Sequence, residues 1–248
     1  MIHSFLLIGQ SNMAGRGCLT EVHEIDTTRI KVLRNGRWQP MFRPINPDRS
    51  VSGVNLAESF AEAYAKKYEV DVGLICCADG GTNLEQWQEG ELLYDNAVYQ
   101  AKLAQRTSTI AGVLWHQGEG NCREGAFDNY KIDFEKIMNA LRRDLDLYDV
   151  PFLLGGLGDF LSECEQFPFL KNYPFVNKQL KQVVKDNPMT CFIPADNLTS
   201  NSDKLHFDSK GLYEFGLRYF EGYEKTYDPN KCFQEKSEYS IHTEMEKL

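Results

Sequence analysis

The chain begins with the apolar run Phe5-Leu6-Leu7-Ile8, which leads directly into Gly9-Gln10-Ser11-Asn12-Met13. A short apolar run closed by a glycine is typical of a buried strand in a parallel sheet. The small and polar residues that follow predict a turn into a helix, so Ser11 would lie at the carboxyl end of the strand. Open α/β sheets bind ligands at that end, and free N–H groups at the start of a helix favour negative charge. The stretch therefore predicts an α/β fold with a candidate nucleophile at Ser11.

Strand and helix patterns alternate along the rest of the chain. Apolar runs predict further strands at 72–77, 110–115, 151–155 and 190–193. Helical periodicity marks 55–68, 94–106, 127–145 and 176–184, followed by a last helix from about Ser209 with Asp208 as its N-cap. With the first run this makes five strands separated by helices, which indicates a five-stranded parallel sheet covered on both faces.

The domain organisation expected from these patterns is simple. Residues 1–227 are predicted to form one domain, and 228–248 a polar tail that is partly disordered. Within the irregular stretch from Gly17 to Gly53, two extended runs flank Asn35-Gly36 and predict a tight hairpin. We expect this stretch to shape the mouth of a ligand pocket.

Composition narrows the class of protein. The net charge of −9 argues against nucleic acid or an anionic membrane as the main partner. No apolar segment approaches the ~20 residues that span a bilayer, and no signal-peptide pattern is visible. The seven cysteines are an odd number without metal-ligand spacing, and Cys76-Cys77 lie within an apolar run. A reduced, cytoplasmic setting is the simplest expectation. The sequence does not specify an oligomeric state.

Four loops of the predicted sheet carry residues suited to acyl transfer. They contain Ser11, Gly80-Gly81-Thr82, Trp115-His116-Gln117-Gly118-Glu119 and Asp203-Lys204-Leu205-His206. A serine hydroxyl needs a base to remove its proton, and a histidine held in one tautomer by a carboxylate provides it. The backbone N–H of Ser11, a glycine N–H from Gly80-Gly81 and the amide of Gln117 could stabilise an oxyanion.

Each residue taken alone also fits an ordinary structural role. Ser11 could be a helix cap, His206 a surface residue with Asp203 in a local turn, Gly80-Gly81 a tight turn, and Gln117 and Glu119 loop supports. His116 is a rival base, or a packed structural histidine. Because all of them fall at one edge of the same predicted sheet, the catalytic interpretation is preferred.

In their order and spacing, these four motifs resemble the blocks of the SGNH hydrolase superfamily. More narrowly, they resemble carbohydrate esterase family 6, the acetylxylan esterase and sialate O-acetylesterase-like group. The resemblance implies a flavodoxin-like three-layer α/β/α sandwich and metal-free deacetylation of a sugar ester without a cofactor. It also implies Ser11 as nucleophile, His206 as base and Asp203 as its orienting acid, with Gly81 (Gly80 as the alternative) and Gln117 completing the oxyanion hole.

Other residues near these motifs are candidates for substrate binding or for support of the site. They are Gln10, Asn12, Thr82, Trp87, His116 and Glu119. Trp87 and Trp115 could form an apolar wall for a sugar ring, or simply pack in the core. The chain departs from the family where Gly120-Asn121 replaces the usual Ser-Asp, which puts in doubt the hydrogen bonds of that acid.

The sequence thus predicts a serine esterase that removes acetyl groups from a carbohydrate through an acetyl-enzyme. Within the class, a sialate O-acetylesterase or an esterase for another acylated small molecule is the alternative. A non-catalytic carbohydrate-binding protein on the same fold is the alternative from another class. A flavodoxin-like cofactor protein is disfavoured because the first loop lacks a phosphate-cradling glycine pattern.

Overall fold

Strand β1 (Ile2–Gly9) lies at the centre of the sheet in the computed structural model, which describes residues 1–226. It pairs in parallel with β4 (Asp71–Cys76) on one side and with β5 (Ser108–His116) on the other. Its residues Phe5–Ile8 are completely buried, as expected for a strand covered on both faces. The apolar run that opens the chain therefore forms the core of the fold.

The sheet has seven strands in the order β3-β2-β4-β1-β5-β6-β7. The other strands are β2 (Ile30–Arg34), β3 (Arg37–Pro40), β6 (Phe152–Gly155) and β7 (Thr190–Ile193). All neighbouring strands pair in parallel except β2 and β3, which form an antiparallel hairpin.

The expected count of five strands is wrong because the predicted hairpin belongs to the sheet. Strand β2 pairs in parallel with β4, and its alternate residues Ile30 and Val32 are buried in the core. Asn35 and Gly36 both have positive φ, at 51° and 74°, which suits a two-residue hairpin turn. One face of the hairpin is thus apolar enough to extend the sheet edge.

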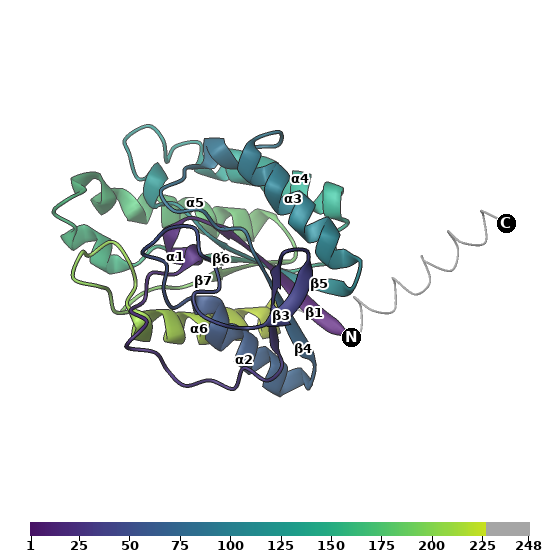
Figure 1. Ribbon diagram of the computed structural model, residues 1–248. Coiled ribbons are helices and arrows are strands. Elements are labelled where there is room, and N and C mark those ends of the chain that lie inside the picture. Colours follow the sequence, from purple (N-terminus) through teal and green to yellow (C-terminus); the bar gives the residue numbers. More distant parts are fainter. Residues whose placement is uncertain (227–248) are drawn as a thin grey trace.

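Helices cover both faces of the sheet, so the predicted three-layer α/β/α class is confirmed (Figure 1). The helices α2 (Leu56–Tyr68) and α6 (Ser209–Thr226) cover one face, and α3 (Leu92–Gln105), α4 (Tyr130–Leu145) and α5 (Tyr173–Asp186) cover the other. Phe5 of β1 packs edge-to-face on Phe60 and Tyr64 of α2, with ring centroids 4.7 and 4.8 Å apart. Such aromatic packing fixes the helix layer against the sheet.

Some element ends differ from the sequence prediction. The helix after Ser11, α1 (Ser11–Ala14), is a single turn. Helix α4 begins at Tyr130 rather than at Phe127, which instead stacks on Phe175. Asp208 caps α6 as predicted, since its Oδ1 accepts a hydrogen bond from Gly211 N–H at 2.7 Å. Short 3₁₀ helices lie at Leu84–Trp87, Glu119–Asn121, Asp159–Glu163 and Pro168–Asn172.

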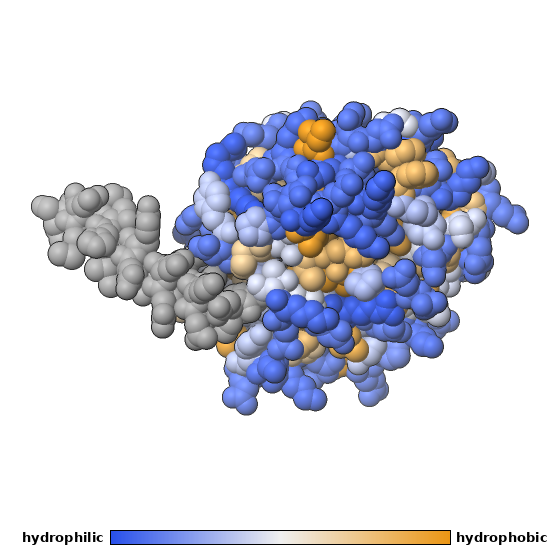
Figure 2. All heavy atoms as spheres, turned by 180° about the vertical axis from the view of Figure 1, so that it is seen from behind, coloured by the Kyte–Doolittle hydropathy of each residue, from blue (hydrophilic) through white to orange (hydrophobic). Residues whose placement is uncertain are grey.

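The surface seen from behind is mostly hydrophilic, with hydrophobic residues gathered in smaller patches between charged ones (Figure 2). Within residues 1–226, no helix combines the length and the apolar character needed to cross a bilayer. The predicted polar tail lies outside the described residues.

Candidate active site

Ser11 lies two residues after the end of β1, at the carboxyl edge of the sheet where the strand order changes direction. The strand leaves no room for a side chain at Gly9, because an added Cβ would lie 2.1 Å from the His116 carbonyl oxygen. Gly9 also has φ of 134°, which only glycine adopts readily. Gln10 N–H then donates to the same His116 oxygen at 2.9 Å. These contacts hold the serine turn against the loop that follows β5.

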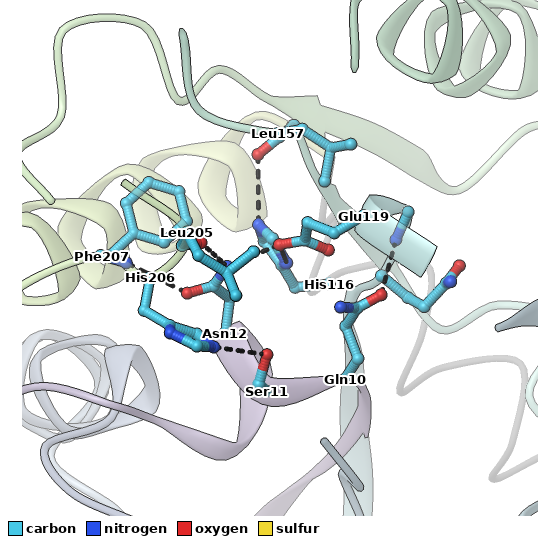
Figure 3. Close-up of polar contacts among 12 residues, drawn as sticks. Gln10, Ser11, Asn12, His116, Glu119, Leu157, Leu205, His206 and Phe207 are labelled. Atoms are coloured by element: carbon cyan, nitrogen blue, oxygen red, sulfur yellow. Dashed lines mark hydrogen bonds and ion pairs between the residues drawn. The ribbon is translucent and has the colours of Figure 1, made fainter. Parts of the chain in front are cut away.

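Ser11, His206 and Asp203 form a continuous hydrogen-bonded chain, and Figure 3 shows its contact between Ser11 and His206. The Ser11 Oγ lies 3.0 Å from Nε2 of His206, although the two residues are 195 positions apart. The Nδ1 of His206 lies 2.7 Å from Oδ2 of Asp203. With the Nδ1 proton donated to the carboxylate, Nε2 is free to accept the serine proton. The structure therefore brings the three predicted triad residues together in the required order.

Asp203 is held as a carboxylate by its surroundings. Burial raises its pKa, but hydrogen bonds from the His206 ring and from the N–H groups of Leu205 and His206 outweigh burial and lower the pKa below its usual value. Its Oδ1 accepts these two backbone N–H groups at 2.9 and 3.0 Å, while Oδ2 faces the ring. The short turn predicted from the Asp-x-x-His spacing thus fixes the tautomer of the histidine.

The loop after β4 offers one backbone donor beside Ser11. Gly80 N–H is engaged, because it donates to Oδ2 of Asp48 at 2.9 Å. Gly81 N–H has no hydrogen-bond partner within residues 1–226. Gly81 has φ of 80°, and nothing lies within 4 Å of where its Cβ would be, so it borders open space. Gly81 therefore suits the oxyanion role, and the Gly80 alternative does not.

Gln117 does not occupy the position expected of an oxyanion donor. Its side chain is completely buried, and its Nε2 donates to Oδ1 of Asn121 at 2.7 Å and to the Thr82 carbonyl at 3.2 Å. Its Oε1 accepts a hydrogen bond from the Tyr130 hydroxyl. Both amide hydrogens are thus engaged in bracing two loops. The prediction of Gln117 as an oxyanion donor is wrong for this geometry.

The tryptophans do not form a wall of the pocket. Trp87 and Trp115 are buried and pack edge-to-face with ring centroids 5.8 Å apart, so the sugar-stacking expectation is wrong. The Trp87 indole N–H donates to Oγ1 of Thr82, which itself donates to the Asp79 carbonyl. Thr82 is likewise buried and acts as a support that closes the glycine loop.

His116 is buried and does not contact Ser11, which rules it out as the rival base in this geometry. Its Nε2–H donates to the Gly156 carbonyl at 3.2 Å, and Nδ1 lies 3.8 Å from Oε1 of Glu119. Burial lowers the pKa of His116 more strongly than Glu119 and the Gly156 hydrogen bond raise it. His116 is therefore a neutral structural histidine.

Asn12 and Glu119 connect the serine turn to the histidine loop (Figure 3). The Asn12 Nδ2 donates to Oε1 of Glu119 at 2.5 Å and to the Leu205 carbonyl at 3.1 Å. Its Oδ1 accepts from Phe207 N–H at 3.1 Å. Asn12 and Glu119 are both buried. They are supports of the site, one of the two roles expected for them.

A pocket of about 380 Å³ opens beside Ser11 and His206, a size typical of small-ligand sites. Its lining includes residues that no sequence motif marked: Arg16, Arg49, Arg123, Phe167, Phe169 and Leu170. Arg49 comes from the irregular stretch expected to shape the pocket mouth. The aromatic residues come from the long loop after β6, where neither periodicity nor a motif marked them.

At Gly120-Asn121, where the family usually has Ser-Asp, the Asn121 side chain accepts two hydrogen bonds. The Asn121 Oδ1 accepts from Gln117 Nε2 and from Leu84 N–H, as a carboxylate oxygen would. A Cβ at Gly120 would lie 2.8 Å from the Thr82 carbonyl oxygen. Glycine at this position therefore allows the two loops to approach.

Among residues 1–226, no three His, Cys, Asp or Glu side chains converge as metal ligands would.

A family model described as "Carbohydrate esterase, sialic acid-specific acetylesterase" matches residues 1–225. The chain is 27% identical to a probable carbohydrate esterase of Arabidopsis thaliana, over 88% of this chain and 89% of that protein. The solved structure of an Arabidopsis thaliana protein, AT4G34215, matches with a TM-score of 0.80 at 24% identity, covering 91% of this chain and 99% of that one.

Two further solved structures share the fold. NanS matches with a TM-score of 0.71 at 17% identity, covering 90% of this chain and 97% of that one. A carbohydrate acetylesterase from Xanthomonas citri matches with a TM-score of 0.68 at 16% identity, covering 90% of this chain and 56% of that one.

Proposed function

The chain belongs to the carbohydrate esterase family described as sialic acid-specific acetylesterases, and from this premise we propose that it removes O-acetyl groups from a sugar by a Ser-His-Asp mechanism. Membership makes it a carboxylic ester hydrolase acting on acetylated sugars. The observation that carries the mechanism is the hydrogen-bonded chain from Asp203 through His206 to Ser11, which ends in the pocket.

In the first half of the reaction, the Ser11 Oγ attacks the carbonyl carbon of the acetyl ester. The Nε2 of His206 takes the hydroxyl proton, and the carbonyl oxygen becomes an oxyanion facing the N–H groups of Ser11 and Gly81. When the tetrahedral intermediate collapses, the sugar oxygen leaves with the proton from His206. Asp203 stabilises the imidazolium formed in between.

In the second half, water attacks the acetyl-enzyme. The Nε2 of His206 accepts a proton from this water, and the resulting intermediate releases acetate and restores the Ser11 hydroxyl. Proton transfer by a positioned histidine typically accelerates such a step by about 10²–10⁴-fold. The 3.0 Å contact between Ser11 and His206 lies within the distance that this transfer needs.

Covalent labelling tests the nucleophile directly. An organophosphonate should add one phosphonyl group to the protein, which mass spectrometry of a digest should place on Ser11. Ser11→Ala is expected to take up no label. Labelling at another residue, or none in the folded wild-type protein, would instead favour a carbohydrate-binding protein on the same fold.

A carboxylated sugar such as a sialate is the more specific substrate candidate, and Arg123 supports it. Arg123 borders the pocket and lies over the Phe169 ring, with its guanidinium carbon 4.2 Å from the ring centroid. No carboxylate within residues 1–226 pairs with Arg123, whereas Arg49 is balanced by Asp79 at 2.6 Å. A substrate carboxylate would complete the site at Arg123.

Paired substrates test this choice. Arg123→Met should lower kcat/KM for an O-acetylated sialic acid by about tenfold, the worth of one hydrogen bond to a charged group. It should leave a neutral acetylated xylooligosaccharide unaffected. Arg49→Met serves as the matched control, because its charge is already balanced. Equal losses on both substrates would favour the neutral acetylated sugar.

A further inference from the structure

A buried ion pair between Arg16 and Asp48 lies against the glycine loop beside Ser11. Nη1 and Nη2 of Arg16 donate to Oδ1 and Oδ2 of Asp48 at 3.0 and 2.7 Å, and the two side chains are only 6% and 4% exposed. Taking two charges out of water is costly, so a buried ion pair by itself adds little net stability. Its place next to the nucleophile instead points to a role in fixing the geometry of the site.

The carboxylate of Asp48 also binds the main chain of the glycine loop. Its Oδ2 accepts the N–H of Gly80 at 2.9 Å, and its Oδ1 accepts the hydroxyl of Ser52 at 2.8 Å. Burial raises the pKa of Asp48, but these hydrogen bonds and the Arg16 guanidinium together outweigh burial and lower the pKa below its usual value. Asp48 is therefore an ionised acceptor that is held in one orientation.

Gly80 fits closely between this ion pair and the nucleophile. A Cβ at this position would lie 2.5 Å from Nη2 of Arg16, 2.9 Å from Oδ2 of Asp48 and 3.4 Å from Cβ of Ser11. The next residue, Gly81, borders the pocket, and its N–H has no partner within residues 1–226. Of these two consecutive N–H groups, the protein binds the first and leaves the second for a ligand. Turning the second away from the pocket would require the first to leave Asp48.

We propose that Asp48 and Arg16 are positioning residues for the oxyanion site: by binding the N–H of Gly80, Asp48 holds the N–H of Gly81 toward the oxyanion. Arg16 keeps the carboxylate in place through two hydrogen bonds. Accurate placement matters because a donor stabilises an oxyanion only at about 2.7–3.1 Å from it. The inference rests on the serine-esterase mechanism proposed above, in which Gly81 donates to the reacting oxygen.

Two double variants separate the acceptor at position 48 from the charges. The leucine double variant, Arg16→Met with Asp48→Leu, removes both charges and the acceptor. The asparagine double variant, Arg16→Met with Asp48→Asn, removes both charges but keeps an oxygen that can accept from Gly80, while its amide can donate to the Ser52 hydroxyl. Replacing both members of a buried ion pair leaves no unpaired charge and is usually tolerated. The two proteins then differ in the hydrogen bond to Gly80.

The rates on 4-nitrophenyl acetate should follow the acceptor. In the leucine double variant, kcat should fall about 10²-fold, the cost of a displacement of about 1 Å at a reacting group. KM should change little, because the N–H of Gly81 acts on the oxyanion and not on the bound ester. In the asparagine double variant, kcat should recover to within about fivefold of wild type, inside the range of one hydrogen bond.

The thiono analogue of 4-nitrophenyl acetate shows whether the lost rate comes from the oxyanion. Its sulfur replaces the carbonyl oxygen and accepts hydrogen bonds only weakly, so it gains little from Gly81. The preference for the oxygen ester, taken as the ratio of the two kcat/KM values, should shrink at least about tenfold in the leucine double variant. The asparagine double variant should restore it. Displacement of Ser11 or His206 would slow both esters equally and leave the ratio unchanged.

The outcomes are distinct once circular dichroism establishes that each variant is folded. A slow leucine double variant with a reduced ratio, and recovery of both values in the asparagine double variant, supports the proposal. Wild-type rates in both, equal losses in both, or slow turnover with an unchanged ratio overturns it. If the leucine double variant does not fold, Arg16→Met with Asp48→Ala replaces it in the same comparison, since alanine adds no bulk.

Ser11→Ala, assayed alongside, tests the esterase mechanism itself. If Ser11→Ala keeps full activity, the mechanism fails whatever the double variants do. If Ser11→Ala is inactive while the leucine double variant stays fast, only the positioning role of Arg16 and Asp48 fails.

Discussion

Asn12 binds the main chain on both sides of His206, through the Leu205 carbonyl and the Phe207 N–H, each at 3.1 Å. The residue next to the nucleophile thus positions the loop that carries the base. Glu119 accepts a hydrogen bond from the same Asn12 amide, and this bond fixes the orientation of the Asn12 side chain. These hydrogen bonds join three segments that are far apart in the sequence: the turn after β1, the loop after β5 and the loop that carries His206.

Asn12→Ala should therefore slow turnover without removing any triad residue. A displacement of about 1 Å at a reacting group can cost about 10²-fold in rate, and we expect a loss of kcat of that order. Loss of the buried hydrogen bonds should also lower the free energy of unfolding by about 1–3 kcal/mol. Steady-state kinetics and urea unfolding measure the two effects.

Asn177→Ala is the matched control for Asn12→Ala. Asn177 binds the main chain of Leu157 through both its N–H and its carbonyl, at 2.8 and 3.0 Å, but it does not touch the His206 loop. We expect a similar loss of stability with kcat close to wild type. If Asn12→Ala also kept the wild-type kcat, Asn12 would not position the base.

Glu119 should support catalysis by accepting the hydrogen bond of Asn12, and its negative charge should not be needed. Glu119→Gln keeps an oxygen for Asn12 Nδ2 and should retain kcat within about threefold, well inside the range of one hydrogen bond. Glu119→Ala leaves Asn12 without that acceptor, and its kcat should fall at least tenfold. Kinetics of the two variants on one aryl acetate decide the matter. Equal losses in both would show that the carboxylate charge is needed.

Asp203→Asn tests the orientation of His206. The asparagine oxygen can still accept from Leu205 and His206 N–H, but its amide would face Nδ1 of the ring and favour the wrong tautomer. Loss of the carboxylate in such a triad lowers kcat by about 10⁴-fold, and a loss of about 10³–10⁴-fold is expected because Asp203 is partly exposed. Crystallography of the variant would show whether the 3.0 Å contact of His206 with Ser11 is kept. A kcat within tenfold of wild type would contradict the assigned role.

His116 should make the fold less stable in acid. Burial lowers its folded pKa below the unfolded value of 6.5, so below pH 6.5 the unfolded chain binds a proton that the folded chain does not. Stability should then fall as the pH drops, by up to about 1.4 kcal/mol per pH unit from this one group, until the folded pKa is reached.

The acid dependence is measured by urea unfolding between pH 8 and pH 5. We expect His116→Gln to lose less stability across this range than wild type, with His23→Gln at an exposed position as control. An identical pH dependence in wild type and His116→Gln would show that His116 does not titrate on unfolding.

The central strand and the triad could be predicted because their signals are local. The apolar run Phe5–Ile8 ends at Gly9-Gln10-Ser11, which by itself indicates a strand and a turn. The three-residue spacing of Asp203 and His206 allows one turn to present both side chains, as the structure shows. The helices were likewise predicted from periodicity, with errors at their ends.

The rest of the site depends on contacts between distant segments, which no local pattern reveals. Gln117 turns inward because Thr82, Asn121 and Tyr130 offer partners there. The amide nitrogen of Gln10 is left on the side of the pocket because Gly118 and Gly120, in the loop after β5, bind the amide oxygen. Both are glutamines in motif blocks, and only the folded structure distinguishes them. The pocket arginines and phenylalanines lie in loops without periodicity.

The most direct test of the account is the release of acetate from 4-nitrophenyl acetate by wild type, Ser11→Ala and His206→Ala, measured with equal amounts of folded protein. The account predicts turnover by wild type and a loss of at least about 10³-fold in each variant, because nucleophile and base act as one unit. Release by wild type that persists in Ser11→Ala would contradict the Ser11 mechanism on which the other proposals depend.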